Sequence, residues 1–207
     1  MEVAGADVWE DLAQYKMGDD PNPPPVAVNA LIVKATAEEL GPIEDRLIAI
    51  VESTNATQEA KWFSCRMLQR VGTEKCVPVL ASLLGDETMS HYARLTLERM
   101  TGSKAAGKAL IKALGKVPDT LKIGIMGSLA ARGDEKGVKP IARQLRSDNP
   151  AVSRAAMAAL SKIGGKRATK AIAKAEREDV GAWAKDAGML ELFAHADADV
   201  ASGLVMK

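Results

Sequence analysis

The chain has 207 residues, 47% of them hydrophobic and 27% charged, so its composition is that of a globular protein and excludes a disordered chain. Charged residues interrupt every apolar stretch well before the roughly 18 residues of a membrane-spanning helix, and two cysteines are too few for a disulfide framework. The formal net charge of +1 conceals a strong segregation, because residues 1–60 carry net −9 and residues 102–174 carry net +12. This asymmetry favours a polyanionic partner or self-association.

The N-terminal residues predict a short helix at 6–16, followed by a proline-rich linker. They lack the basic and apolar regions of a signal peptide, and nothing else in the sequence indicates a compartment. A helix pair is expected next, at 25–39 and 42–53. The predicted domain organisation is an N-terminal helix and linker at 1–24, a repeat domain at 25–178, and a capping helix with an acidic tail at 179–207.

Glycine recurs every 30 or 31 residues along most of the chain. Each of these glycines follows one apolar helical pattern and precedes another, which is where a glycine in left-handed geometry ends a helix. An aliphatic residue follows eight positions after most of them and a second one four positions later, so both lie on one helix face. The glycines are Gly41, Gly72, Gly102, Gly133 and Gly164, and the two aliphatic columns are Leu80, Leu110, Ile141 and Ile172, and Leu84, Leu114 and Leu145.

Each repeat is therefore expected to consist of two helices joined by tight turns. Asn149 followed by Pro150 predicts an N-cap with proline at the first helical position. Because one helix pair cannot bury its apolar stripe alone, stacked neighbours must form a continuous core. The predicted fold is all-α, a right-handed α-solenoid of about five stacked helix pairs with a period of about 31 residues. The first helices are expected at 57–71, 87–100, 118–131 and 150–163, and the second helices at 73–84, 103–115, 134–146 and 165–178.

The segment from Ser147 to Gly164 reads Ser-Asp-Asn-Pro-Ala-Val-Ser-Arg-Ala-Ala-Met-Ala-Ala-Leu-Ser-Lys-Ile-Gly, and it resembles a HEAT-type repeat. The repeat length resembles that of the short HEAT-like variety found in phycobilisome lyases. Segments 9–18, 63–72 and 90–99 look like the HEAT-like modules of planctomycete and verrucomicrobial proteins. This resemblance covers about 25–178 and implies an α-solenoid whose second helices line the concave surface. It says little about function, because such repeats serve many partners.

Basic residues follow the same period on the second helices and define what we call the basic ladder. Its two columns lie four residues apart, so they share one helix face. Since like charges in register repel, folding does not require this arrangement, although duplication of a solvated lysine would also produce it. The basic ladder consists of Lys108, Lys139 and Lys170 in one column and Lys112, Arg143 and Lys174 in the other.

The basic ladder leads to three functional hypotheses. The first is a non-catalytic scaffold that binds an acidic protein segment, with head-to-tail self-association as a further possibility. The second is a nucleic-acid-binding module, which is weakened because no aromatic stacking residue lies between Tyr92 and Trp183. The third, drawn from the resemblance, is an accessory subunit of the lyase type.

Residues for metal binding and catalysis are scarce. His91 and His195 are the only histidines, and Cys65 and Cys76 do not form a Cys-x-x-Cys pair, so we expect no metal, no cofactor and no enzyme activity. Both cysteines are expected to be small buried residues. Trp62 and Phe63 are expected to fill seams between repeats.

Overall fold

The structure is a computed structural model that describes residues 5–18 and 23–177. Contacts divide the chain into two compact units, Met1–Ala105 and Ala106–Lys207, and the division falls in the first turn of α7 (Lys104–Leu114). The described residues form helices and no strand, as predicted for an all-α repeat fold. The predicted domain boundaries remain a prediction, and the predicted helix at 180–195 lies outside the described residues.

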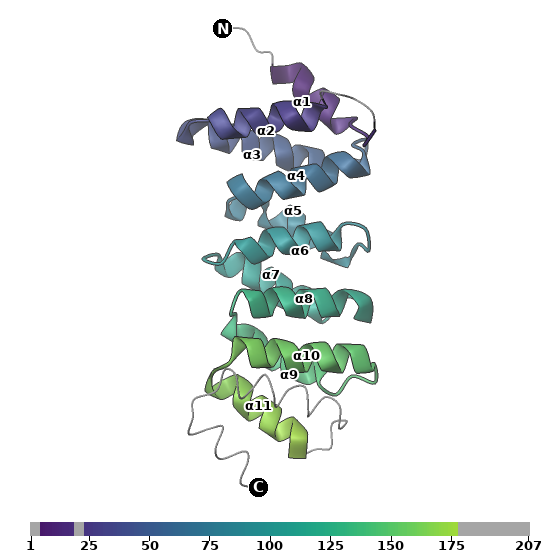
Figure 1. Ribbon diagram of the computed structural model, residues 1–207, viewed down its shortest axis with the longest axis vertical. Helices are drawn as coiled ribbons and strands as arrows, with labels where there is room; N and C mark the ends of the chain where they lie inside the picture. The colour runs from purple at the N-terminus through teal and green to yellow at the C-terminus, as the bar shows by residue number, and fades with distance from the viewer. Residues whose placement is uncertain (1–4, 19–22, 178–207) are drawn as a thin grey trace. The chain divides into compact units, whose positions relative to one another are not determined.

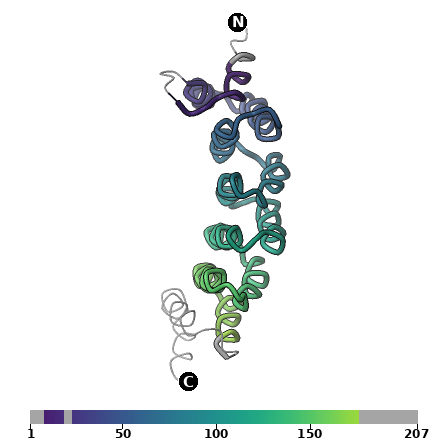
Figure 2. The backbone as a smooth tube through the Cα atoms, turned by 90° about the vertical axis from the view of Figure 1, so that its right-hand side faces the viewer, coloured from purple at the N-terminus to yellow at the C-terminus, as the bar shows by residue number. Residues whose placement is uncertain are grey.

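The first unit contains six α-helices among its described residues (Figure 1). Helix α1 packs on α2, α3 packs on α4 and α5, and α6 packs on α4 and α5. In Figure 2, α4 and α6 lie in one row and α3 and α5 in the other. The helices are α1 (Gly5–Ala13), α2 (Pro24–Lys34), α3 (Ala37–Glu52), α4 (Gln58–Val71), α5 (Val77–Ser82) and α6 (Ser90–Arg99).

The second unit continues the same pattern. Helix α10 packs on α8, α9 and α11, and α11 also packs on α9. Figure 2 shows α8 and α10 in one row, and α9 and α11 in the other. The helices that follow α7 are α8 (Asp119–Ala131), α9 (Val138–Gln144), α10 (Pro150–Ile163) and α11 (Gly165–Arg177).

The aliphatic columns predicted from the repeat form the core. All seven members of the two second-helix columns are buried, and so are Leu68, Leu97, Leu129 and Leu160 on the first helices. A fully buried leucine or isoleucine contributes about 1.5–3 kcal/mol relative to an exposed one, so the repeated positions supply much of the packing energy. The predicted first helices α4, α6, α8 and α10 are confirmed to within about three residues at each end.

Two of the predicted second helices are shorter than expected because each contains a proline. A continuous helix from residue 73 would need an N–H at Pro78, and its ring would clash with the carbonyl of Glu74. The chain instead forms a 3₁₀ turn at Glu74–Cys76 and starts α5 at Val77. Pro140 has the same effect on α9, which follows a 3₁₀ turn at Glu135–Gly137. The second helices without proline, α7 and α11, are continuous as predicted.

The prediction that Gly41 ends a helix is wrong. Helix α2 ends at Lys34, and α3 runs through both Gly41 and Pro42. The reason is the capping box at the start of α3, where the backbone N–H of Thr36 donates to Glu39 Oε2 at 2.8 Å. The capping box starts the helix ahead of Gly41, and the burial of Leu47, Ile50 and Val51 further along α3 offsets the cost of the glycine and the proline.

The expected left-handed geometry also holds at only some of the repeat glycines. Gly133 and Gly164 have positive φ values of 64° and 67°. Gly72 ends α4 with a φ of −66°, so the prediction is wrong there. At Gly72 the requirement is space, because a Cβ atom would collide with the carbonyl oxygen of Leu68 and approach Cys76 Sγ to 2.9 Å.

Candidate functional site

The basic ladder residues of α9 and α11 are exposed because their neighbours in the helical period are buried. On α9, Ile141 and Leu145 face the core, and Lys139 and Arg143 lie two residues before them. On α11, Ala168, Ile172 and Ala175 are buried, which leaves Lys170 and Lys174 exposed. The helical period therefore turns one face of each helix to the core and the cationic face to the surface.

A groove opens between these two helices, where the small side chains of Ala142 and Ala171 face it. It has two adjoining hollows of about 220 and 480 Å³, which share Lys139, Ala142, Ala171 and Lys174. We call this pair of hollows the basic groove. Its other lining residues are Glu135, Lys136, Val138, Arg143, Leu145, Arg146, Arg167, Lys170 and Ala175.

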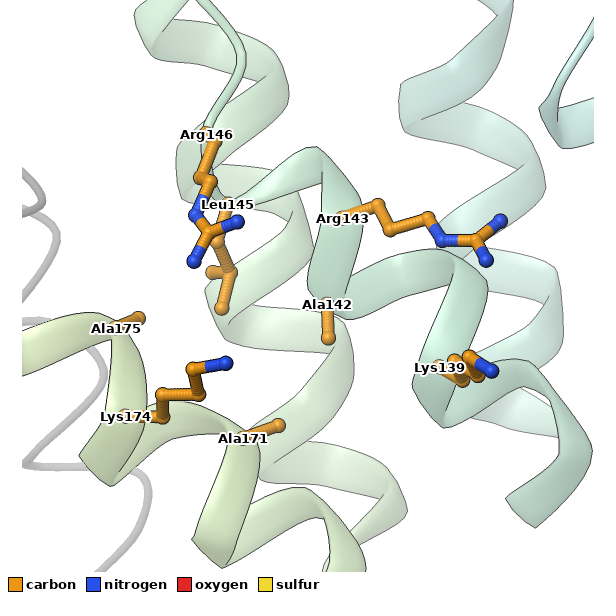
Figure 3. A pocket seen from close by; sticks show the side chains of 8 residues that line it. All are labelled: Lys139, Ala142, Arg143, Leu145, Arg146, Ala171, Lys174 and Ala175. Atoms are coloured by element: carbon orange, nitrogen blue, oxygen red, sulfur yellow. The ribbon is translucent and has the colours of Figure 1, made fainter. Parts of the chain in front are cut away.

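Figure 3 shows the smaller hollow from close by. The charged ends of Arg146 and Lys174 point into the same space, and Lys139 and Arg143 project from the α9 side. Ala142 and Ala171 form the floor between them. An elongated anionic chain laid along this floor would meet cations on both sides.

Two of the acidic residues described in the second unit, Asp119 and Asp134, are engaged by neighbouring basic side chains outside the basic groove. Arg132 Nε donates to Asp134 Oδ2 at 2.7 Å, and Lys122 Nζ donates to Asp119 Oδ1 at 2.8 Å. The hydrogen bonds from Lys122 and Asn149 lower the pKa of the Asp119 carboxyl below its ordinary value. Glu135 lies 3.8 Å from Arg167 in an exposed ion pair, which contributes little to stability.

Most of the basic ladder forms no ion pair within the part of the chain that the structure describes. Within residues 5–18 and 23–177, no ion pair joins Lys108, Lys112, Lys139, Arg143 or Lys170 to a carboxylate. Lys108 and Lys112 are exposed on α7 and lie outside the basic groove. The structure thus brings four of the six predicted residues together around one groove.

No cluster of three or more histidine, cysteine or carboxylate side chains suitable for a metal occurs in the described part of the chain. Cys65 and Cys76 are both buried, as predicted, and burial raises the pKa of each thiol to about 12. His91 Nδ1 lies 3.1 Å from Arg94 Nη2, on the outside of α6.

A second groove, in the first unit, was not anticipated from the sequence. It is lined by Tyr15, Trp62, Phe63 and Tyr92, so Trp62 and Phe63 border a surface groove. The missed signal is the interval of 30 residues between Trp62 and Tyr92, which equals the repeat period and places both rings on successive first helices.

A comparison with family models agrees with a helical repeat architecture. Residues 107–192 match the family model for HEAT repeats. The crystal structure of an engineered protein from the Northeast Structural Genomics Consortium is similar at a TM-score of 0.49 and 20% identity, over 95% of this chain and 97% of that one. No curated protein matches the chain.

HEAT repeats are generally scaffolds for protein interactions, and their fold is typically non-catalytic. No catalytic family is indicated by the comparisons. Among the described helices, none combines the length and the hydropathy needed to cross a membrane.

Proposed function

We propose that this protein is a non-catalytic scaffold that binds an acidic protein segment through the basic ladder. The observation that carries the proposal is the basic groove, which presents four exposed ladder cations along a floor of small apolar side chains. The apolar floor accepts side-chain contacts from a peptide, and the flanking charges select for carboxylates.

Arginine and lysine contribute differently to this surface. Arg143 and Arg146 offer planar guanidinium groups that bind carboxylates through two parallel hydrogen bonds. The lysines supply mobile positive charge that attracts an acidic segment from a distance. Complementary charge of this kind raises the association rate more than it raises the final affinity.

A nucleic acid would meet the same positive charge and competes with the acidic segment as a partner. It is the weaker candidate because residues 93–182 contain no aromatic side chain for base stacking. The proposal therefore favours an acidic protein over a phosphate backbone.

The test is a capture experiment from lysate, with and without nuclease, using three baits. The first bait is the unmodified chain, and the second replaces Lys139, Arg143 and Lys170 by serine. The third replaces Lys116, Arg154 and Lys162 by serine, which removes the same charge from exposed positions outside the basic groove. A captured protein is then truncated to its acidic segment, and the affinity of that purified peptide for each of the three chains is measured.

We expect a nuclease-resistant partner whose acidic peptide binds about tenfold more weakly to the groove variant than to the charge-matched control. Equal affinity for both variants would overturn the assignment of the site. Capture of nucleic acid alone, with binding that falls steeply as salt is raised, would replace the acidic segment by a phosphate backbone.

A further inference from the structure

The first unit concentrates its aromatic side chains around one groove. The described residues contain five aromatic side chains, and four of them, Tyr15, Trp62, Phe63 and Tyr92, line a hollow of about 480 Å³. We call this hollow the aromatic groove. Its size is within the range of ligand-binding pockets. Such a gathering is notable in a chain with only 3% aromatic residues.

The two central rings of the aromatic groove form a stacked pair. The ring centroids of Trp62 and Tyr92 lie 5.3 Å apart, with an angle of 22° between the ring planes. No acceptor for the indole N–H of Trp62 is present among the described residues. Stacking and packing, and not a hydrogen bond, therefore fix the orientation of this ring.

The wall that carries Tyr15 is anchored to the start of α4. The backbone N–H of Thr57 donates to the carbonyl oxygen of Ala13 at 2.9 Å, and the Thr57 hydroxyl donates to the carbonyl oxygen of Tyr15. The same hydroxyl accepts from the backbone N–H of Ala60 and caps α4. The aromatic groove is thus preformed by the local fold, which lowers the ordering cost of binding.

One edge of the groove is apolar, and Pro25 of α2 forms part of its wall. Pro25 lines it, beside Met17 and Val26, whose exposed fractions are 73% and 54%. This edge therefore offers hydrocarbon surface against which the prolyl rings of a bound peptide can pack.

The other edge carries a cation. Arg66 lines the groove from α4 and is exposed, and no ion pair joins it to a carboxylate within residues 5–18 and 23–177. Glu59, also from α4, lines the groove one turn before Phe63. A peptide that places a carboxylate against Arg66 would gain a charge-assisted hydrogen bond at this edge.

We propose that the aromatic groove binds a proline-containing peptide in the polyproline II conformation, with an acidic residue against Arg66. Polyproline II segments have no internal hydrogen bonds and lose little entropy on binding, and aromatic-lined grooves recognise them by packing against their rings. The proposal adds a second site, in the first unit, to the scaffold proposed above. It depends on neither the basic ladder nor its acidic partner.

The test uses a fluorescein-labelled decapeptide with the sequence Pro-Pro-Leu-Pro-Glu-Pro-Pro-Leu-Pro-Glu and the full chain. Its control peptide has every proline replaced by glycine. Anisotropy gives the affinity, and the indole N–H signals in ¹H–¹⁵N spectra, assigned with Trp62→Phe, locate the binding. We expect the proline peptide to bind at least about tenfold more tightly than the glycine peptide and to shift the Trp62 signal.

Three variants separate recognition from folding. Arg66→Glu is expected to weaken binding about tenfold, whereas Arg99→Glu, at an exposed position outside the groove, leaves it unchanged. Tyr92→Phe keeps the stacked ring and should retain binding. Equal binding of both peptides, no effect of Arg66→Glu, or no shift of the Trp62 signal would each overturn the proposal. Self-association that Arg66→Glu abolishes, without peptide binding, would assign the groove to a second copy instead.

Discussion

The two units are built from the same kind of helix pair, but they differ in the polar residues that follow the repeat glycines. In the first unit, a hydroxyl residue follows two of the repeat glycines, Thr73 after Gly72 and Ser103 after Gly102. A glutamate 29 residues earlier accepts a hydrogen bond from each of them. Glu44 accepts from the backbone N–H of Thr73 at 2.7 Å, and Glu74 accepts from the Ser103 hydroxyl at 2.6 Å. These bonds link successive second helices.

In the second unit the equivalent residues are Asp134 and Gly165, and neither has a hydroxyl. The glutamate at the matching position, Glu135, has a side chain that is 75% exposed and pairs only loosely with Arg167. Without hydroxyl partners, the second helices of this unit carry their polar residues outward. The comparison shows that a repeat can use its polar positions for hydrogen bonds between helices, as in the first unit, or can expose them on the surface, as in the second.

The units also differ in their large and reactive side chains. The four residues of the aromatic groove and both cysteines lie in the first unit, and residues 106–177 contain neither aromatic residues nor cysteine. The second unit packs through alanine, leucine and isoleucine, which brings α9 and α11 close and shapes the basic groove. The following predictions sharpen or break this contrast, from the largest expected effect to the smallest.

The largest effect concerns the thiols. Burial raises the pKa of Cys65 from its ordinary value of 9.0 to about 12, with a smaller contribution from Cys76. The thiolate fraction at pH 8 should therefore fall about a thousandfold, and alkylation by iodoacetamide should slow accordingly relative to the urea-unfolded chain. Mass spectrometry of the trapped thiols gives the rates, and comparable rates in both states would contradict the buried environment.

The same shift predicts a loss of stability in alkali. Since the folded pKa lies above the unfolded value, the stabilising contribution is complete below about pH 9 and is lost as the pH rises toward 12. Hydrogen exchange should show this loss in the first unit, which holds both cysteines. A Cys65→Ala, Cys76→Ala variant should lack that component.

The next effect tests the carboxylate links. Glu44 is 2% exposed and bonds to both the backbone N–H and the hydroxyl of Thr73. Glu44→Ala should lower the free energy of unfolding by about 1.5–3 kcal/mol, because hydrogen bonds to a charged group are lost. Asp45→Ala, one residue on, removes only an exposed ion pair with Lys75 and should cost less than about 1 kcal/mol. Urea titration followed by circular dichroism measures both, and equal losses would show that burial of Glu44 is unimportant.

The smallest effects come from equivalent repeat glycines. Gly72→Ala should cost about 1–3 kcal/mol, because the new methyl group meets the Leu68 carbonyl. Gly164→Ala should also cost about 1–3 kcal/mol, but because of backbone strain. Gly164 has a φ of 67° and a ψ of −165°, which a residue with a side chain rarely adopts. Gly102 has open space and no positive φ, so Gly102→Ala should be neutral or stabilising by about 0.4–1 kcal/mol. Thermal unfolding compares the three, and a common effect would contradict these separate causes.

Much of the fold was predictable because the same pattern of glycines and aliphatic residues recurs in successive repeats. The columns from Leu80 to Ile172 and the N-cap at Asn149 required only helical periodicity and capping chemistry. The prediction at Gly41 was wrong because glycine followed by proline usually ends a helix, whereas here the capping box at Thr36 has already started one. The exposed ladder positions were predictable in the same way as the core, since they are its complement on each helix.

The sequence by itself determined the all-α repeat, its core columns and the exposed cationic face of α7, α9 and α11, because all three follow from spacing along one helix. Only the tertiary structure decided which of these faces meet around a groove, since that depends on how closely α9 and α11 pack across Ala142 and Ala171. The tertiary structure likewise brought together Tyr15 from the segment after α1, Trp62 from α4 and Tyr92 from α6. A single helix fixes the direction of its side chains, but a groove is made by the distance between helices, which is a property of packing.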